Sequence, residues 1–147
     1  MKKSIMVVTA ITALASLIWS SACLAVTLSP INKSEFEKSI INKTLTSIPT
    51  DNLNGRTINN TFSFYLDNQG HAWGKMSVKP KDEPQTDQGT YSVDKDGTFH
   101  LTWQHWDYAK TLCGHLFETQ NAYISVDCDN VFHTVFMKEN ILSGNHL

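Results

Sequence analysis

Basic residues are scarce in this chain of 147 residues, and Arg56 is its single arginine. The 12 lysines and arginines face 14 carboxylates, which gives a formal net charge of −2. Binding a nucleic acid requires a stripe or patch of basic side chains that neutralises phosphates, and no such stripe is present. DNA and RNA are therefore not expected partners.

Motifs that identify catalytic and metal sites are also missing. The sequence contains no G-x-S-x-G turn of the kind that presents a serine nucleophile, and no glycine-rich phosphate loop. Six histidines occur, but none belongs to an H-x-H or H-x-x-x-H pair. Asp94, Asp96 and Gly97 match part of a calcium loop without its remaining ligands. We expect no catalytic residues, no metal and no cofactor.

Long apolar runs are confined to the N-terminus. Lys2 and Lys3 precede an uncharged stretch from Ile5 to Trp19, and small residues follow up to Ala25. At roughly 15 residues the stretch is shorter than the ~20 that span a bilayer, which favours a cleaved signal peptide. We predict a signal peptide over 1–25 and one periplasmic or secreted domain over 26–147, with no transmembrane span after processing.

A second processing route stays open. Ser20-Ser21-Ala22-Cys23 resembles a bacterial lipobox, in which the cysteine is lipidated and becomes the new N-terminus. Ser20 stands where that motif usually has leucine, so this alternative, a lipid anchor through Cys23, matches the pattern less well than simple cleavage.

Only three cysteines are present, and either route leaves Cys113 and Cys128 as a pair. An even number of cysteines in an exported chain predicts a disulfide. Closing a loop of about 15 residues contributes roughly 3 kcal/mol in the chain-entropy model.

One short helix is predicted near the start of the domain. Ser34 and Glu37 have the spacing of a capping box. Phe36, Ile40 and Ile41 then recur on one helical face. The pattern predicts a helix over about 35–45 that packs against the rest of the domain.

Three turns of similar sequence predict the remaining structure. Each begins with aspartate and ends in Gly or Asn, at 67–70, 94–97 and 127–130. A three-residue hairpin loop needs a left-handed residue at its last position, where Gly is favoured and Asn is tolerated. Counting outward from the loops pairs the flanking residues as follows: Leu66–Ala72, Phe64–Gly74 and Phe62–Met76; Val93–Phe99, Tyr91–Leu101 and Gly89–Trp103; Val126–Phe132, Ile124–Thr134 and Ala122–Phe136.

A fourth hairpin turns at Gln120-Asn121, and its symmetric register places Cys113 opposite Cys128. Register counting and cysteine pairing therefore agree on the disulfide. The predicted strands are 57–66, 71–78, 89–93, 98–103, 110–118, 122–126 and 131–137. Short turns between consecutive strands indicate a mainly β protein, an antiparallel meander that curls into a small barrel or a sandwich.

The predicted registers also separate the histidines. They direct His100 and His133 away from the core, and they place His115 on the apolar face between Cys113 and Phe117. An imidazole in apolar surroundings requires a hydrogen-bond partner.

The segment 103–108 is the most unusual one. We predict a ligand site from Trp106, Tyr108, His105 and Asp107, which follow the strand that ends at Trp103. Aromatic side chains on a loop at a barrel mouth can form a platform for a sugar, a peptide or an apolar molecule. The alternative is that the same aromatics fill the barrel end as core, and the residue types alone favour that alternative slightly.

The stretch from Gly89 to Trp103, followed by Trp106 and Cys113, resembles a group of small secreted proteobacterial β-proteins. In that group a G-x-Y-x-V-x-x-D-G strand-turn-strand precedes a tryptophan and then a cysteine, as here. The resemblance covers about half of the domain. It implies a lipocalin-like or barrel architecture in the bacterial envelope and assigns no catalytic residue.

Three functions stay open on these grounds. The first is an exported, non-catalytic protein that holds a small ligand at the barrel end. The second is an interaction or inhibitor module for an envelope protein, which would use loops or an edge strand. The third and least favoured is a hydrolase, which would need His105 and Asp107 to converge with a serine.

Overall fold

The computed structural model describes residues 28–48, 51–53, 56–58, 61–77 and 85–147. The predicted signal peptide and Cys23 lie outside the described residues. The elements are α1 (Lys33–Ser39), β1 (Lys43–Thr46), β2 (Asp51–Leu53), β3 (Arg56–Ile58), β4 (Phe62–Leu66), β5 (His71–Met76), β6 (Thr86–Val93), β7 (Phe99–Trp103), η1 (Trp106–Ala109), β8 (Thr111–Glu118), β9 (Ala122–Asp127), β10 (Phe132–Met137), η2 (Lys138–Asn140) and β11 (Leu142–Ser143).

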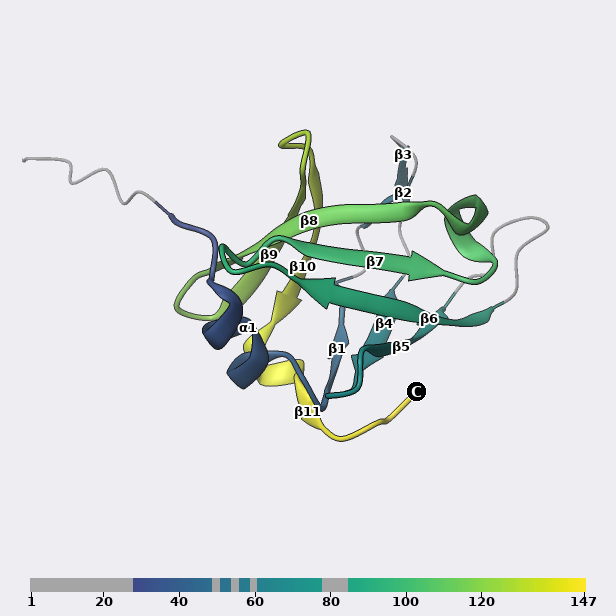
Figure 1. Cartoon of the computed structure of the whole chain (residues 1–147), viewed down its shortest axis with the longest axis horizontal. Helices are drawn as coiled ribbons and strands as arrows, with labels where there is room; N and C mark the ends of the chain where they lie inside the picture. The colour runs from purple at the N-terminus through teal and green to yellow at the C-terminus, as the bar shows by residue number, and fades with distance from the viewer. Residues whose placement is uncertain (1–27, 49–50, 54–55, 59–60, 78–84) are drawn as a thin grey trace, which may run out of the picture.

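One antiparallel sheet dominates the described part of the chain. Its nine strands are ordered β10-β9-β8-β7-β6-β5-β4-β1-β11, and β2 and β3 form a separate small hairpin (Figure 1). The two sides of the sheet approach each other where Ser47 bridges to Phe136 and the Ile48 amide donates to the Val135 carbonyl at 2.9 Å. The sheet therefore curls into a barrel-like form, which confirms the predicted mainly β fold with one short helix.

The helix α1 lies at one end of this curled sheet, and η1 lies at the other (Figure 1). The N-terminal capping residue of α1 is Asn32. Its side-chain oxygen accepts from the Glu35 amide, and the Glu35 carboxylate accepts from the Asn32 amide. The predicted cap at Ser34 is therefore wrong by two residues. The helix is also shorter than predicted, because the last residues of the expected helix, 43–45, belong to strand β1. None of the helices in the described ranges has the length and apolar character of a membrane span.

The first two predicted hairpins are confirmed at every pair. Strands β4 and β5 pair Phe64 with Gly74, and β6 and β7 pair Tyr91 with Leu101, as counting from the turns requires. Gly70 and Gly97 end their loops with φ of 90°. This is the left-handed backbone that the turn rule assigns to that position.

The third hairpin follows the prediction only at its first pair, Val126 with Phe132. A β-bulge between Phe132 and Thr134 shifts the register, so Thr134 pairs with Ser125 and Phe136 with Tyr123. The predicted pairs Ile124–Thr134 and Ala122–Phe136 are therefore wrong. One extra residue in β10 displaces every later pair by one position.

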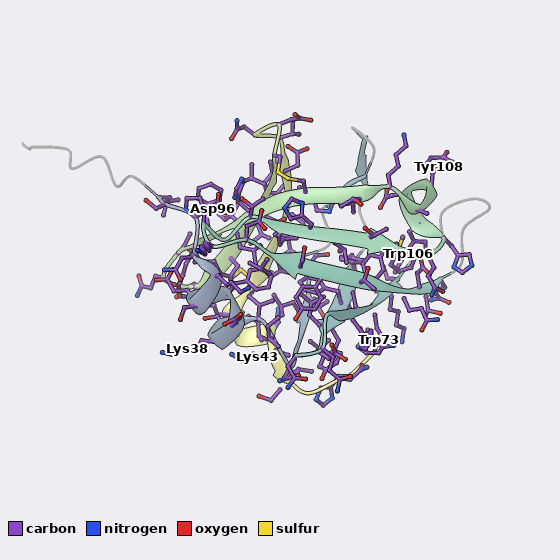
Figure 2. All side chains as sticks on the ribbon, in the orientation of Figure 1. Lys38, Lys43, Trp73, Asp96, Trp106 and Tyr108 are labelled. Atoms are coloured by element: carbon purple, nitrogen blue, oxygen red, sulfur yellow. A yellow bond between two sulfur atoms is a disulfide. The ribbon has the colours of Figure 1, made fainter. Side chains whose placement is uncertain are left out.

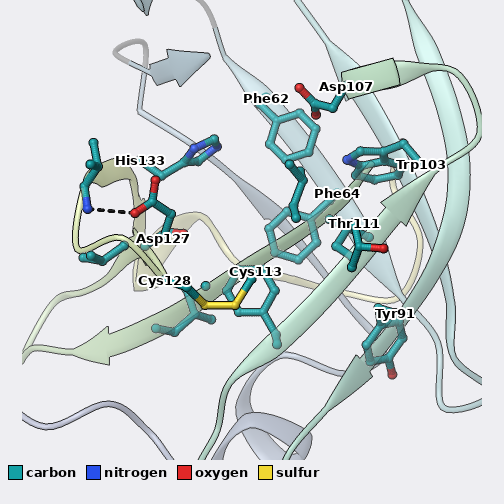
Figure 3. A pocket seen from close by; sticks show the side chains of 18 of the residues that line it. Phe62, Phe64, Tyr91, Trp103, Asp107, Thr111, Cys113, Asp127, Cys128 and His133 are labelled. Atoms are coloured by element: carbon teal, nitrogen blue, oxygen red, sulfur yellow. Dashed lines mark hydrogen bonds between the residues drawn. A yellow bond between two sulfur atoms is a disulfide. The ribbon is translucent and has the colours of Figure 1, made fainter. Parts of the chain in front are cut away.

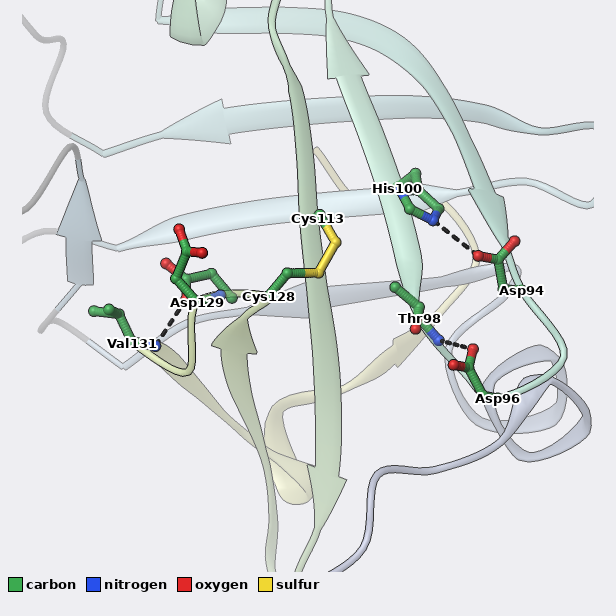
Figure 4. The surroundings of a disulfide bond; sticks show 9 residues. Asp94, Asp96, Thr98, His100, Cys113, Cys128, Asp129 and Val131 are labelled. Carbon is green, nitrogen blue, oxygen red and sulfur yellow. Dashed lines mark hydrogen bonds and ion pairs between the residues drawn. A yellow bond between two sulfur atoms is a disulfide. The ribbon is translucent and has the colours of Figure 1, made fainter.

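The fourth hairpin has the predicted register, and the disulfide between Cys113 and Cys128 is confirmed with a Cα–Cα distance of 5.5 Å (Figure 4). The Cys128 amide also donates to the Cys113 carbonyl at 3.2 Å. The bond joins the start of β8 to the residue that follows β9, so it fixes the β9–β10 turn against β8.

His115 lies on the outer side of β8. The prediction that it faces the core is therefore wrong. Its two neighbours, Gly114 and Leu116, are buried, whereas His115 is half-buried and pairs with the half-buried Val126. Nearby, residues 30 and 31 run alongside β8. Pro30 forms an antiparallel bridge with Phe117, and the Ile31 amide donates to the Leu116 carbonyl at 2.8 Å. Atom Nδ1 of His115 is buried without a hydrogen-bond partner from the described residues. His100 points outward as predicted, with its Nε2 3.0 Å from Asp94 Oδ2.

Candidate functional site

The curled sheet encloses a cavity of about 490 Å³ (Figure 3). Barrels of this size have interiors that are either filled by side chains or left with room for one small ligand. The volume here lies in the range of ordinary small-molecule sites, roughly 300–1,000 Å³. Its apolar lining includes Phe36, Phe62, Phe64, Leu66, Met76, Phe99, Leu101, Trp103, Trp106, Leu112, Leu116 and Phe136.

The two ends of the cavity differ. At the helix end, Phe36 of α1 is 1% exposed and its ring lies 6.0 Å from that of Phe99. The opposite end, which we call the mouth, is lined by residues of η1 and of the β9–β10 turn. Val131 and Phe132 line the cavity there while remaining 47% and 43% exposed. Apolar side chains that stay exposed beside an apolar cavity are typical of the rim of a binding site.

Trp106 forms part of the cavity wall at the mouth and is 1% exposed. Its ring lies 5.0 Å from that of Trp103 and 5.9 Å from that of Phe62, in edge-to-face arrangements. Gly74 makes this packing possible, because a Cβ at that position would lie 2.4 Å from the Trp106 ring. Trp106 is therefore core as well as lining.

The carboxylate of Asp87, on β6, holds the chain that leads into η1. Asp87 Oδ2 accepts from the amides of His105 and Trp106 at 2.8 and 2.9 Å, and Oδ1 lies 2.9 Å from His105 Nδ1. Burial raises the pKa of this carboxyl, but the hydrogen bonds outweigh burial and the net pKa is lowered. Asp87 therefore anchors Trp106 in place.

The next three residues adopt an unusual backbone. Asp107, Tyr108 and Ala109 all have positive φ, at 53°, 57° and 55°. Non-glycine residues rarely adopt this conformation, and strained backbone of this kind concentrates at functional sites. Tyr108 is 81% exposed in this turn (Figure 2), whereas Asp107 is 9% exposed and lines the cavity.

Asp107 is a buried carboxyl with little compensation. Burial raises its pKa, and a favourable interaction with His133 lowers it only in part. No hydrogen bond from another described residue contributes to its pKa. An ionised carboxylate in such a place is destabilised unless a positive charge or a donor reaches it.

His133 also lines the mouth of the cavity (Figure 3). The sequence prediction directed it away from the core, which is wrong. The bulge in β10 falls between Phe132 and Thr134 and re-aims His133 to the inside. Bulges often turn a side chain in this way. Sequence reasoning missed His133 because it assumed strict alternation along the strand.

The four residues predicted as a ligand site are thus divided. Trp106 and Asp107 line the cavity. The His105 side chain is 65% exposed and bonds Asp87, and Tyr108 projects outward. The structure therefore brings two of the four to the cavity and adds His133 to them.

The chemical groups at the mouth are few. Among the described residues, no three His, Cys, Asp or Glu side chains are grouped so that they could hold a metal ion. Asp127, which also lines the mouth, uses Oδ1 to accept from the amides of Asp129 and Val131 at 3.0 and 2.8 Å. Asp127 therefore serves the turn, and the cavity is also lined by Asp107, Asp129 and His133.

Comparison of the chain with protein-family models, with curated proteins and with solved structures finds no match. The resemblance to secreted proteobacterial β-proteins stays a prediction.

Proposed function

We propose that this protein is an exported, non-catalytic binding protein that holds one small, mainly apolar ligand inside its curled sheet. The observation that carries the proposal is the cavity of about 490 Å³ with aromatic and aliphatic walls. Burying apolar surface of a ligand stabilises a complex by roughly 25 cal/mol per Å² before the costs of association.

Several features of the mouth support access from solvent at that end. The helix end is closed by the buried Phe36, whereas the mouth has the exposed Val131 and Phe132. The disulfide ties the β9–β10 turn to β8 and so keeps this rim in place. A rigid, largely preformed cavity lowers the ordering cost of binding.

Export is the second part of the proposal. A disulfide is typical of proteins that fold in an oxidising compartment, and the N-terminal pattern is that of a signal peptide. Intact-mass spectrometry of the protein recovered from the producing cells tests this directly. We expect a chain that begins at Val26 with an oxidised Cys113–Cys128 pair, and a full-length mass would contradict export with cleavage.

Binding is tested with the apolar fluorophore N-phenyl-1-naphthylamine. Its emission should rise and shift to the blue on binding, with saturation at one molecule per chain. The variant Ser125→Phe places a large ring on a buried residue that lines the cavity. Ser92→Phe, at an exposed position on β6, is the matched control.

We expect Ser125→Phe to weaken probe binding at least tenfold and Ser92→Phe to leave it unchanged. Thermal unfolding of each variant shows whether it is folded, and Ser125→Leu replaces the larger change should the phenylalanine variant fail to fold. Absence of saturable binding, or equal binding by a folded Ser125 variant, would refute the proposed cavity site.

A further inference from the structure

A buried carboxyl at the mouth of an apolar cavity needs an explanation. Asp107 is 9% exposed and lines the cavity. No hydrogen bond from another described residue lowers the pKa of its carboxyl. It also lies in a strained left-handed turn. A group that is costly to bury and costly to position in this way indicates a role in binding.

The charges that line the cavity are one-sided. Apart from His133 and Tyr91, the titratable side chains there are three carboxylates, those of Asp107, Asp127 and Asp129, and no lysine or arginine is among the described lining residues. A ligand with a carboxylate or phosphate head would meet repulsion at the mouth. A ligand with a positive head would meet attraction.

We propose that the ligand is an amphiphile with an apolar tail and a protonated amine, whose amine pairs with the Asp107 carboxylate at the mouth while the tail fills the cavity. The inference rests on the proposed function, because it assigns a chemical class to the ligand of the same cavity. The helix end supports this orientation, because Phe36 and Phe99 meet there.

The amine is favoured over a neutral donor such as an alcohol. A hydrogen bond between an ammonium and a carboxylate is about twice as strong as one between neutral groups. The ligand's charge would also compensate the desolvation of Asp107, which His133 compensates only in part. Tyr91, toward the far end from the mouth, offers little competition, since its hydroxyl already donates to the Asp67 carbonyl.

The test is competition against bound N-phenyl-1-naphthylamine by decylamine, decanol and decanoate, at neutral pH and below their critical micelle concentrations. The three ligands share one tail and differ in the charge of the head. We expect decylamine to displace the probe at concentrations at least tenfold lower than decanol, and decanoate to be the weakest. The same order should hold in isothermal titration calorimetry without the probe.

Asp107→Asn removes the negative charge and keeps the shape of the side chain. Asparagine tolerates the left-handed backbone at this position, so the variant is expected to fold. It should bind decylamine at least tenfold more weakly and decanol within twofold of the wild type. Glu139→Gln removes one carboxylate from an exposed position on η2, near the helix end, and is the matched control for net charge.

The outcomes separate this inference from the proposed function. Equal binding of the three ligands, or an Asp107→Asn variant that keeps the preference for the amine, overturns the inference and leaves a cavity of another specificity. Tightest binding of decanoate that is lost in His133→Gln overturns it in favour of an anion site. Failure of the probe and of all three ligands to bind overturns both proposals.

Discussion

Asp87 and Asp107 are two buried carboxyl groups at the same end of the curled sheet, and they behave in opposite ways. Asp87 is 7% exposed and Asp107 is 9% exposed, so burial alone does not distinguish them. The backbone amides of Gln88, His105 and Trp106 donate hydrogen bonds to the Asp87 carboxylate. For Asp107, no hydrogen bond from a described residue contributes to the pKa of the carboxyl. The pKa of Asp87 is lowered and that of Asp107 is raised.

This difference in hydrogen bonding makes Asp87 a structural group and leaves the Asp107 carboxyl available to bind a ligand. Hydrogen bonds to the ionised form offset the desolvation of Asp87 and make its charge part of the fold. The desolvation of Asp107 is offset only in part, so its charge lowers the stability of the protein without a ligand. Asp87 also holds Trp106 and thereby positions Asp107, which is the next residue. One carboxylate builds the mouth and the other faces the cavity.

The largest effect is expected for Asp87→Ala. The substitution leaves the buried amide of Trp106 without its acceptor and also removes the acceptor of the His105 amide. Loss of hydrogen bonds to a buried charge should lower the free energy of unfolding by about 3 kcal/mol. Urea denaturation measures the change, and near-UV circular dichroism should report the release of Trp106.

The pH dependence of the same variant provides a check. Because the pKa of folded Asp87 lies below its ordinary value of 3.8, its contribution is present above about pH 4 and is lost as the pH falls through the folded pKa. The difference between wild type and Asp87→Ala should therefore narrow in acid. A constant difference from pH 7 to pH 3 would show that the charge of Asp87 contributes nothing.

The second effect has the opposite sign. Asp107→Asn should raise the free energy of unfolding by about 1 kcal/mol at pH 7, because a poorly compensated buried charge is removed. Burial raises the pKa of folded Asp107 above 3.8, so the wild type loses stability as the pH rises through this window. Thermal unfolding from pH 3 to pH 8 should show the variant's advantage appear with rising pH. A variant less stable than wild type at pH 7 would mean that Asp107 is a structural group like Asp87.

Local rules predicted much of the sheet. The loops that end at Gly70 and Gly97 require a left-handed residue, and that requirement alone set two correct registers. The pairing of Cys113 with Cys128 followed from counting along a symmetric hairpin. These features depend on residues close together in the sequence. Strand β1 was missed because the helical spacing of Phe36, Ile40 and Ile41 was extended into it.

The candidate site was less accessible to prediction for a physical reason. The bulge that turns His133 inward is a single extra residue without a glycine or proline to indicate it. The left-handed turn at Asp107, Tyr108 and Ala109 contains no glycine either, so the opposite directions of Asp107 and Tyr108 could not be read from the residue types. The turn is also held by contacts between residues far apart in the sequence, those of Asp87 with the amides of His105 and Trp106.

The smallest effect is expected for His105→Ala. The imidazole lies 2.9 Å from Asp87 Oδ1, but the side chain is 65% exposed and solvent screens its interaction with the carboxylate. The His105 amide, which donates to Asp87 at 2.8 Å, is unaffected by the substitution. We expect a loss of about 0.5 kcal/mol in urea denaturation. His100→Ala, which removes a similar contact to Asp94, is the matched control. A loss close to that of Asp87→Ala would show that the imidazole, and not the backbone amides, stabilises the Asp87 charge.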